Sequence, residues 1–201
     1  EGEDLADLAR REVARLADDG GGHQGLGRIL DDHHPRGGLL DVDPHGQHAT
    51  LTQSFGPEAR GSACSAQVVV SDTRVQYPYV TAPKILMAMS HDGYMTHKDN
   101  VAEDCIFVYE KDLVKIGKHG AKTSSYGVPA TRIAEELGRK IVLNIVMLGF
   151  LAAVTDVVPH IALRKAVETS VPSGTEELNL KAFDKGYEYG VNLKEKAEVK
   201  V

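Results

Sequence analysis

The chain has 201 residues, of which 42% are hydrophobic and 26% are charged, and its formal net charge at pH 7 is -6. This length and composition fit one globular domain with a sizeable core, and they exclude a collagen, a wholly disordered chain and a disulfide scaffold. A net negative charge also gives no overall basic footprint for nucleic acid.

The two cysteines, Cys64 and Cys105, are too few to hold an iron–sulfur cluster or a structural zinc ion without other chains. A disulfide between them remains open, but the lack of a cysteine-rich framework favours a reducing compartment. Residues 1–15 are charged and carry no apolar signal-peptide core. We therefore expect a cytoplasmic protein.

The first 50 residues differ from the rest of the sequence. Apolar residues at helical spacing (Leu5, Leu8, Val13 and Leu16) predict a short amphipathic helix within 1–19. Glycine, proline and histidine follow over 20–48, where neither a helix period nor a strand period survives. We expect a loop-rich segment there.

Three short apolar runs predict buried strands at 67–71, 84–90 and 105–109. Continuous apolar runs, in place of strict alternation, are typical of strands covered on both faces of a parallel sheet. The sequence therefore predicts an α/β fold.

Helices are predicted at 131–137, 142–154, 161–168 and 175–189. The second lies within an almost wholly apolar stretch, 141–158, which we interpret as a buried core or interface helix and not a membrane span. The last follows a capping-box pattern, Ser173 to Glu176, and places Leu180, Phe183 and Tyr187 on one face.

A glycine turn, with Gly21, Gly22, Gln24 and Gly25, could present bare backbone N–H groups to a phosphate. A dinucleotide fingerprint needs a clear strand directly before such a turn, and the sequence shows none. No Walker lysine follows either. A plain flexible turn therefore remains the alternative.

A second motif begins in the segment 52–63. Gly56 and Pro57 force a turn, and an arginine among small residues, Arg60, suits a phosphate or carboxylate ligand. The alternative is a structural ion pair between Glu58 and Arg60 that holds the loop.

Other polar residues carry weaker signals. His33, His34, His45 and His48 lie in the irregular segment, where nothing predicts a rigid shell, so we predict solvated loop histidines and no metal site. A histidine-rich metal-binding protein is the alternative. Ser90, His91 and Asp92 are contiguous and cannot form a hydrolase triad, because neighbouring side chains on a strand point to opposite faces. We interpret His91 as an ordinary residue of a loop between strand and helix.

Several linked motifs resemble one family. The sequence resembles the gamma subunit of 2-oxoacid:ferredoxin oxidoreductases, most closely the 2-oxoglutarate type, over residues 50–190. The matching segments, in the order and spacing of the family, are 52–61 (TQSFGPEARG), 63–72 (ACSAQVVVSD), 77–78, 86–90, 128–131, 144–149 and 171–183 (VPSGTEELNLKAF).

The resemblance implies a three-layer α/β/α domain with a mainly parallel, Rossmann-like sheet, and it implies a hetero-oligomeric enzyme. That enzyme decarboxylates a 2-oxoacid on thiamine diphosphate with magnesium. It passes two electrons through iron–sulfur clusters to ferredoxin and releases an acyl-CoA, which would be succinyl-CoA for 2-oxoglutarate. The implied partners are thiamine-binding catalytic subunits, a ferredoxin-like subunit and ferredoxin, with no nucleic acid and no membrane span.

The gamma subunit itself holds neither the thiamine nor the clusters, and it is not catalytic alone. Pyruvate or a branched-chain 2-oxoacid remains open as the substrate. A non-catalytic nucleotide-binding or assembly module is the competing class. We expect one gamma-type domain over 1–201, with 1–50 irregular and poorly matched and 191–201 a frayed tail.

The resemblance also assigns a role to the second motif. The family's Gly-Pro-Glu-x-Arg-Gly loop falls on Gly56, Pro57, Glu58, Arg60 and Gly61, with Ser62 where a second glycine is usual. We predict that this loop, beginning at Ser54, lines the approach of coenzyme A. In this prediction Arg60 faces an anionic group and Glu58 orients it. The family's glycine turn aligns with Gly21, Gly22, Gln24 and Gly25, with His23 inserted.

Overall fold

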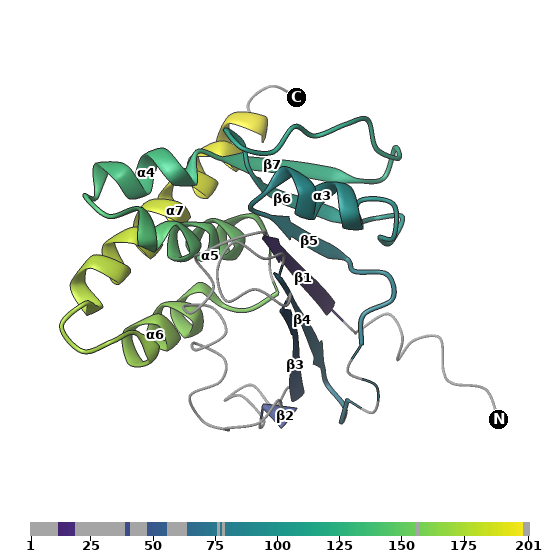
Figure 1. The fold of residues 1–201 in the computed structure, drawn as a ribbon, viewed down its shortest axis with the longest axis horizontal. Coiled ribbons are helices and arrows are strands. Elements are labelled where there is room, and N and C mark those ends of the chain that lie inside the picture. Colours follow the sequence, from purple (N-terminus) through teal and green to yellow (C-terminus); the bar gives the residue numbers. More distant parts are fainter. Residues whose placement is uncertain are drawn as a thin grey trace.

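The computed structural model describes residues 12–18, 39–40, 48–55, 64–75, 77, 79–155 and 157–198. Within these ranges the chain forms a seven-stranded sheet in the order β2-β3-β4-β1-β5-β6-β7 (Figure 1). The strands are β1 (Glu12–Asp18), β2 (Leu39–Leu40), β3 (His48–Phe55), β4 (Cys64–Ser71), β5 (Ile85–Ala88), β6 (Ile106–Glu110) and β7 (Ser124–Val128).

The half of the sheet made of β1, β5, β6 and β7 is parallel. Strand β5 has the burial that is typical of a parallel sheet, since all four of its residues are buried. Ile85 and Met87 belong to the core on one face, while Leu86 and Ala88 belong to the core on the other face. A strand covered on both sides shows the continuous apolar run that predicted it.

The other half of the sheet is antiparallel, because β4 pairs antiparallel with both β1 and β3, and β2 pairs antiparallel with β3. The predicted strand 67–71 is therefore present but does not run parallel to its neighbours. Most of its side chains are only half-buried, and only Val69 and Ser71 are buried. A strand with partial cover is typical of antiparallel pairing.

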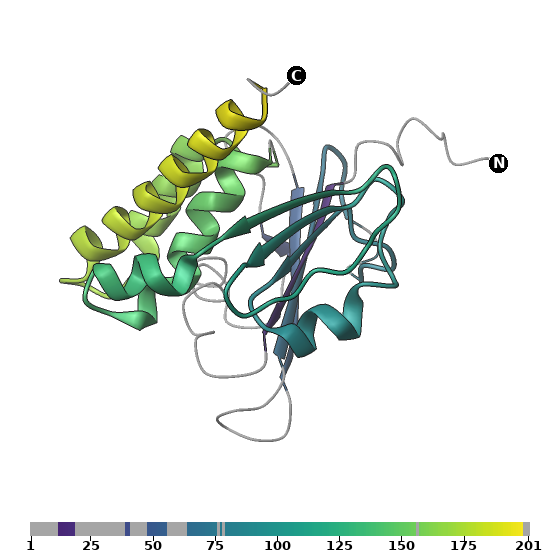
Figure 2. The ribbon, with the colours of Figure 1, turned by 90° about the horizontal axis from the view of Figure 1, so that it is seen from above.

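Helices cover both faces of the sheet, so the predicted three-layer α/β/α architecture is confirmed. The helices are α3 (His91–His97), α4 (Ala130–Glu136), α5 (Leu143–Val154), α6 (His160–Ser170) and α7 (Glu176–Glu198), with a short 3-10 turn at Lys140–Val142. Figure 2 shows α3 on one face and α4 to α7 gathered on the opposite face.

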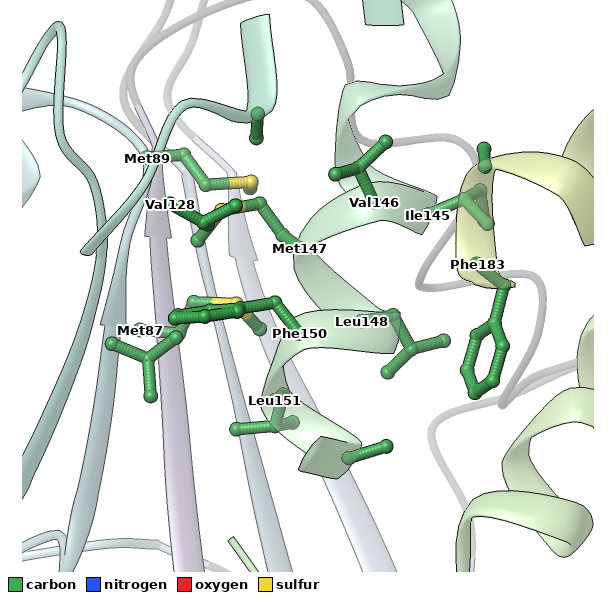
Figure 3. Close-up of a cluster of buried hydrophobic side chains, with 14 of the residues drawn as sticks. Met87, Met89, Val128, Ile145, Val146, Met147, Leu148, Phe150, Leu151 and Phe183 are labelled. Carbon is green, nitrogen blue, oxygen red and sulfur yellow. The ribbon is translucent and has the colours of Figure 1, made fainter. Parts of the chain in front are cut away.

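Helix α5 forms the centre of the larger core. It lies between the sheet and α7 and is buried nearly all round. Met147 points toward Met89 and Val128 at the sheet and Phe150 toward Met87, whereas Leu148 lies toward Phe183 of α7 (Figure 3). The prediction of a buried core helix at 142–154 is confirmed. No helix in the described ranges is both long enough and apolar enough to cross a membrane.

The contact between α5 and α7 depends on glycines. A Cβ atom added at Gly149 of α5 would collide with the carbonyl oxygen of Phe183, and one added at Gly186 of α7 would collide with that of Val146. At Gly190 an added Cβ would lie 2.5 Å from the Cβ of Ala153. The two helices therefore approach until their backbones touch.

The predicted apolar face of α7 is confirmed, since Leu180, Phe183 and Tyr187 all pack against the larger core. Two details of this helix differ from the prediction. It begins at Glu176 and not at Thr175. The backbone carbonyl of Thr175 accepts a hydrogen bond from the backbone N–H of Asn179 (3.1 Å), and the Thr175 hydroxyl accepts one from the Asn179 side-chain amide (3.1 Å). It also continues to Glu198 and does not end at 189, because its lysine, glutamate and alanine residues favour helix.

The predicted amphipathic helix within 1–19 is wrong for Glu12–Asp18, which forms β1. This strand pairs with β4 on one side and β5 on the other, so backbone partners on both sides outweigh the local helix preference of its leucine, alanine and arginine residues. The irregular segment predicted over 20–48 also contains β2 and the start of β3.

Candidate functional site at the carboxyl edge of the sheet

Five strands end at one edge of the sheet. Because β4 is antiparallel to both β1 and β3, these two run in the same direction, and β5, β6 and β7 run with them. Open α/β sheets bind ligands outside the carboxyl ends of such strands. One row of paired residues marks this edge: Ser54, Ser65, Ala17, Ala88, Tyr109 and Gly127.

Both candidate loops start at this carboxyl edge. Strand β1 ends at Asp18, just before the glycine turn, and β3 ends at Phe55, directly before the Gly-Pro motif. Only β4 lies between β1 and β3, so the two strands are about 10 Å apart. The structure thus brings the starting points of the two motifs together.

The described part of this pair of loops is limited to Ser54, an exposed residue of β3. The other predicted loop residues, Gly56, Pro57, Glu58, Arg60 and Gly61, lie outside the described residues, as do those of the turn, Gly21, Gly22, Gln24 and Gly25. Strand β1 directly precedes the glycine turn, and a dinucleotide-binding fingerprint requires such a strand, which the sequence alone did not reveal.

At the end of β5 the chain turns into α3. The Ser90 hydroxyl caps this helix by accepting a hydrogen bond from the backbone N–H of Gly93 (3.1 Å). The His91 ring accepts one, through Nδ1, from the backbone N–H of Lys115 (3.4 Å). These bonds give Ser90 and His91 structural partners. His91 opens the helix and does not lie in a loop.

At the end of β6 a carboxylate is fully buried. Glu110 is 0% exposed, and its Oε2 accepts from the backbone N–H groups of Asp112 (2.9 Å) and Leu113 (2.6 Å). Its Oε1 accepts from the N–H of Thr131 at the start of α4 (3.4 Å). One side chain thus fixes the turn after β6 and ties it to the segment after β7.

Charged side chains extend this arrangement across the surface. Arg132 donates two hydrogen bonds to the Asp112 carboxylate (2.7 and 3.0 Å), and Lys111 donates one to the hydroxyl of Tyr189 on α7 (2.9 Å). The Lys111 ammonium also lies 5.4 Å from the centre of the Tyr189 ring. The turn after β6 is therefore joined to both α4 and α7.

Tyr109 lies in the same edge row and depends on a glycine beside it. A Cβ atom at Gly127 would lie 2.7 Å from Cζ of the Tyr109 ring. The missing side chain on β7 therefore leaves room for the ring. Neither Glu110 nor Tyr109 carries a sequence pattern that marks it as a site residue; the local signal is an acidic residue directly after the apolar run 105–109.

Replacing Glu110 with alanine should destabilise the protein by about 2–4 kcal/mol, because three part-buried backbone N–H groups lose their acceptor, at about 1 kcal/mol each. Glu110→Gln should cost less, since its amide oxygen still accepts on one side. Urea unfolding measures both changes. Glu103→Gln, which removes the exposed pair with Lys122, is the matched control and should be nearly neutral. Equal stability of Glu110→Ala and wild type would contradict this reading of the turn.

The cysteines and histidines form no metal site in the described part of the chain, where no cluster of three or more metal-ligating side chains occurs. Cys64 and Cys105 are not joined by a disulfide, which closes that alternative. Burial raises the pKa of the Cys105 thiol to about 12, so it stays protonated. His48 lies at the start of β3, while His33, His34 and His45 fall outside the described residues.

Comparison with known proteins decides the family. The profile described as "Pyruvate ferredoxin/flavodoxin oxidoreductase" matches residues 41–189. The chain belongs to this family. It is 44% identical to the 2-oxoglutarate synthase subunit KorC of Methanocaldococcus jannaschii over 149 residues, which are 73% of this chain and 80% of that subunit.

Two further relatives place the chain within the oxidoreductase family. It is 30% identical to the ketoisovalerate oxidoreductase subunit VorA of Methanothermobacter thermautotrophicus over 148 residues, 72% of this chain and 30% of that one. The crystal structure of a keto/oxoacid ferredoxin oxidoreductase gamma subunit from Geobacter sulfurreducens superposes with a TM-score of 0.73 at 29% identity, covering 90% of this chain and 97% of that one. The predicted gamma-type subunit of a 2-oxoacid oxidoreductase is confirmed.

Proposed function

We propose that this chain is the gamma subunit of a cytoplasmic complex that oxidises 2-oxoglutarate. The reaction consumes 2-oxoglutarate, coenzyme A and oxidised ferredoxin, and it yields succinyl-CoA, CO2 and reduced ferredoxin, reversibly. The observation that carries this choice is the 44% identity to a 2-oxoglutarate synthase subunit, against 30% to a ketoisovalerate oxidoreductase subunit.

The thiamine diphosphate, magnesium and iron–sulfur clusters of this complex belong to partner subunits. Iron–sulfur clusters need several thiolate ligands, and this chain has two cysteines, one of which is buried with a pKa of about 12. Ferredoxin and a ferredoxin-like subunit complete the electron path. The chain itself contributes a packed domain, which we propose extends over 1–201.

The carboxyl edge of the sheet is the part of this subunit that contributes to the coenzyme A cleft. The parallel direction of β1 and β3 supports this placement, because the glycine turn and the Gly-Pro-Glu-x-Arg-Gly loop then begin close together at the same edge of the sheet. Coenzyme A carries phosphate groups, which suit backbone N–H groups in a turn and an arginine guanidinium. Arg60 would bind such a group and Glu58 would orient it.

Purification of the native assembly tests the proposed function. We expect this chain to copurify with larger subunits that carry thiamine diphosphate and iron, and the assembly to reduce ferredoxin faster with 2-oxoglutarate than with pyruvate or 2-oxoisovalerate. A preference for 2-oxoisovalerate would overturn the substrate assignment. A lone monomer that binds nucleotide phosphates and assembles with nothing would instead support the non-catalytic module.

A further inference from the structure

The connection from β6 to β7 crosses the α3 face of the sheet without forming a helix. Residues 111–123 make turns and irregular structure throughout (Figure 2). Val114 is buried there and Ile116 is partly buried, and both belong to the smaller core with Leu86 and Phe107. The backbone hydrogen bonds of this segment are isolated turns, from Val114 to the Glu110 carbonyl and from Thr123 to the Gly120 carbonyl, so its position depends mainly on what it contacts.

His119 and the neighbouring Gly117 provide the polar contacts of this connection to Tyr94 of α3. Its ring stacks on Phe107, with ring centres 4.0 Å apart and planes 19° apart, and it meets Tyr94 of α3 edge-on. Its Nε2 lies 2.9 Å from the Tyr94 hydroxyl oxygen. The backbone N–H of Gly117 donates to the same oxygen (3.0 Å). Two residues of the connection therefore meet on one tyrosine hydroxyl.

Burial of Tyr94 favours one direction of its hydrogen bond with His119. Tyr94 is 1% exposed, and its oxygen already accepts from Gly117. In the neutral tautomer with its proton on Nδ1, Nε2 of His119 accepts the hydrogen of the buried hydroxyl. A protonated ring would point an N–H at the hydroxyl and take away the acceptor of a buried hydroxyl hydrogen, which costs stability.

The surroundings of His119 favour the same neutral ring. Burial lowers the pKa of His119 below its ordinary value of 6.5, the Lys98 ammonium lowers it further, and the Asp99 carboxylate opposes this. Lys98 and Asp99 follow α3 and are themselves paired at 2.7 Å. The other titratable groups nearby are His91, whose ring centre lies 6.0 Å from that of Tyr94, and the buried Cys105. Within the segment, Lys115 and Lys118 lie nearest to His119 in sequence, Lys122 pairs with Glu103, and the one acidic residue, Asp112, pairs with Arg132.

We propose that His119 is a proton-sensitive latch, which holds residues 111–123 against Phe107 and Tyr94 when neutral and releases them when protonated. The folded state lowers the pKa of His119, so the stabilisation is complete above the ordinary value of 6.5 and is lost as the pH falls through that value toward the folded one. The turn at Lys111, Asp112 and Leu113 keeps its own bonds to Tyr189, Arg132 and Glu110, so release acts on the part of the segment beyond this turn.

Hydrogen–deuterium exchange of the whole complex, read by mass spectrometry at about pH 5.5 and about pH 7.5, tests the latch. After correction for intrinsic exchange rates, peptides from 111–123 should lose protection severalfold at the lower pH, while peptides from α5 should not. His119→Gln supplies an acceptor oxygen that does not titrate in this range, and the pH dependence should vanish. His160→Gln is the matched control, because His160 also stacks on a tyrosine, Tyr187, at 4.5 Å. It should keep the wild-type response.

Unchanged protection of 111–123 in the wild type, or a pH response that persists in His119→Gln, would overturn the latch. A second measurement needs no variant. The slow exchange of the imidazole C2 hydrogen gives the midpoint of titration of His119 in the wild-type complex. A midpoint below 6.5 supports the latch, and a midpoint at or above 6.5 rejects it.

Discussion

Replacing Gly149 or Gly186 with alanine is expected to destabilise this subunit by at least about 3 kcal/mol, the upper range for overpacking a core. An alanine at Gly149 places its methyl group against the backbone carbonyl of Phe183, whose carbon would lie 2.8 Å away. An alanine at Gly186 meets the carbonyl carbon of Val146 at 2.9 Å. Each substitution therefore sets a side-chain atom against a rigid helix backbone.

Relaxation at this helix crossing is costly on both sides. Helix α5 can move away from α7 only toward the sheet. That movement is blocked, because Met147 and Phe150 are already fully buried against the sheet (Figure 3). Helix α7 can move outward only by uncovering Phe183, which is also fully buried. The added methyl group must therefore open a contact elsewhere in the larger core, which adds a cavity term to the overpacking term.

Thermal unfolding checks the effect at the crossing. A loss of 3 kcal/mol should lower the melting temperature by about 6–12 °C, since each kcal/mol shifts it by about 2–4 °C for 150–250 residues. Gly120→Ala is the matched control, because an added Cβ meets nothing within 4 Å there, and its melting temperature should stay close to wild type. A Gly149→Ala protein that melts with the control would show that the helices do not touch at this point.

The parts of the fold that sequence analysis predicted correctly are those with a local pattern. Strand β5 and helix α5 are apolar on all sides because both are buried on all sides, and that leaves a continuous run in the sequence. Helix α7 covers a core with one face only, so its apolar residues recur at helical spacing.

The missed strands have no such pattern. Strand β7 consists of Ser124, Ser125, Tyr126, Gly127 and Val128, and it is recruited at an edge of the sheet by β6 alone. Strand β1 contains good helix-forming residues and is extended only because β4 and β5 flank it. In both cases the deciding partners are distant in the sequence, so propensity and spacing could not identify them.

The candidate site shows the same division. Spacing and resemblance identified the glycine turn and the Gly-Pro-Glu-x-Arg-Gly loop as separate motifs. Their common edge follows from topology, because the antiparallel return through β4 brings β3 parallel to β1. Glu110 was missed for a related reason: its burial and its partners at 112, 113 and 131 exist only when β6 and α4 are assembled.

Arg60→Ala in the assembled complex should raise the KM for coenzyme A by about thirtyfold or more, since losing a charged hydrogen-bond partner of a bound anion costs about 2 kcal/mol or more. The KM for the 2-oxoacid should change little, because in the proposed complex the thiamine-bearing subunits would bind that substrate. Steady-state ferredoxin reduction, measured over a range of coenzyme A concentrations, separates the two constants. Arg60→Lys should recover part of the loss, as lysine keeps the charge but not the two-pronged geometry.

The chain offers a matched control for this substitution, an arginine at the opposite edge of the sheet. Arg74 is exposed and follows the end of β4, which runs against β1 and β3 and so ends at the other edge. Arg74→Ala makes the same change in net charge without touching the carboxyl edge, and its KM for coenzyme A should stay at the wild-type value. If both alanine variants raised this KM equally, the effect would come from overall charge. If neither did, Arg60 would serve only to pair with Glu58, which was the structural alternative for this loop.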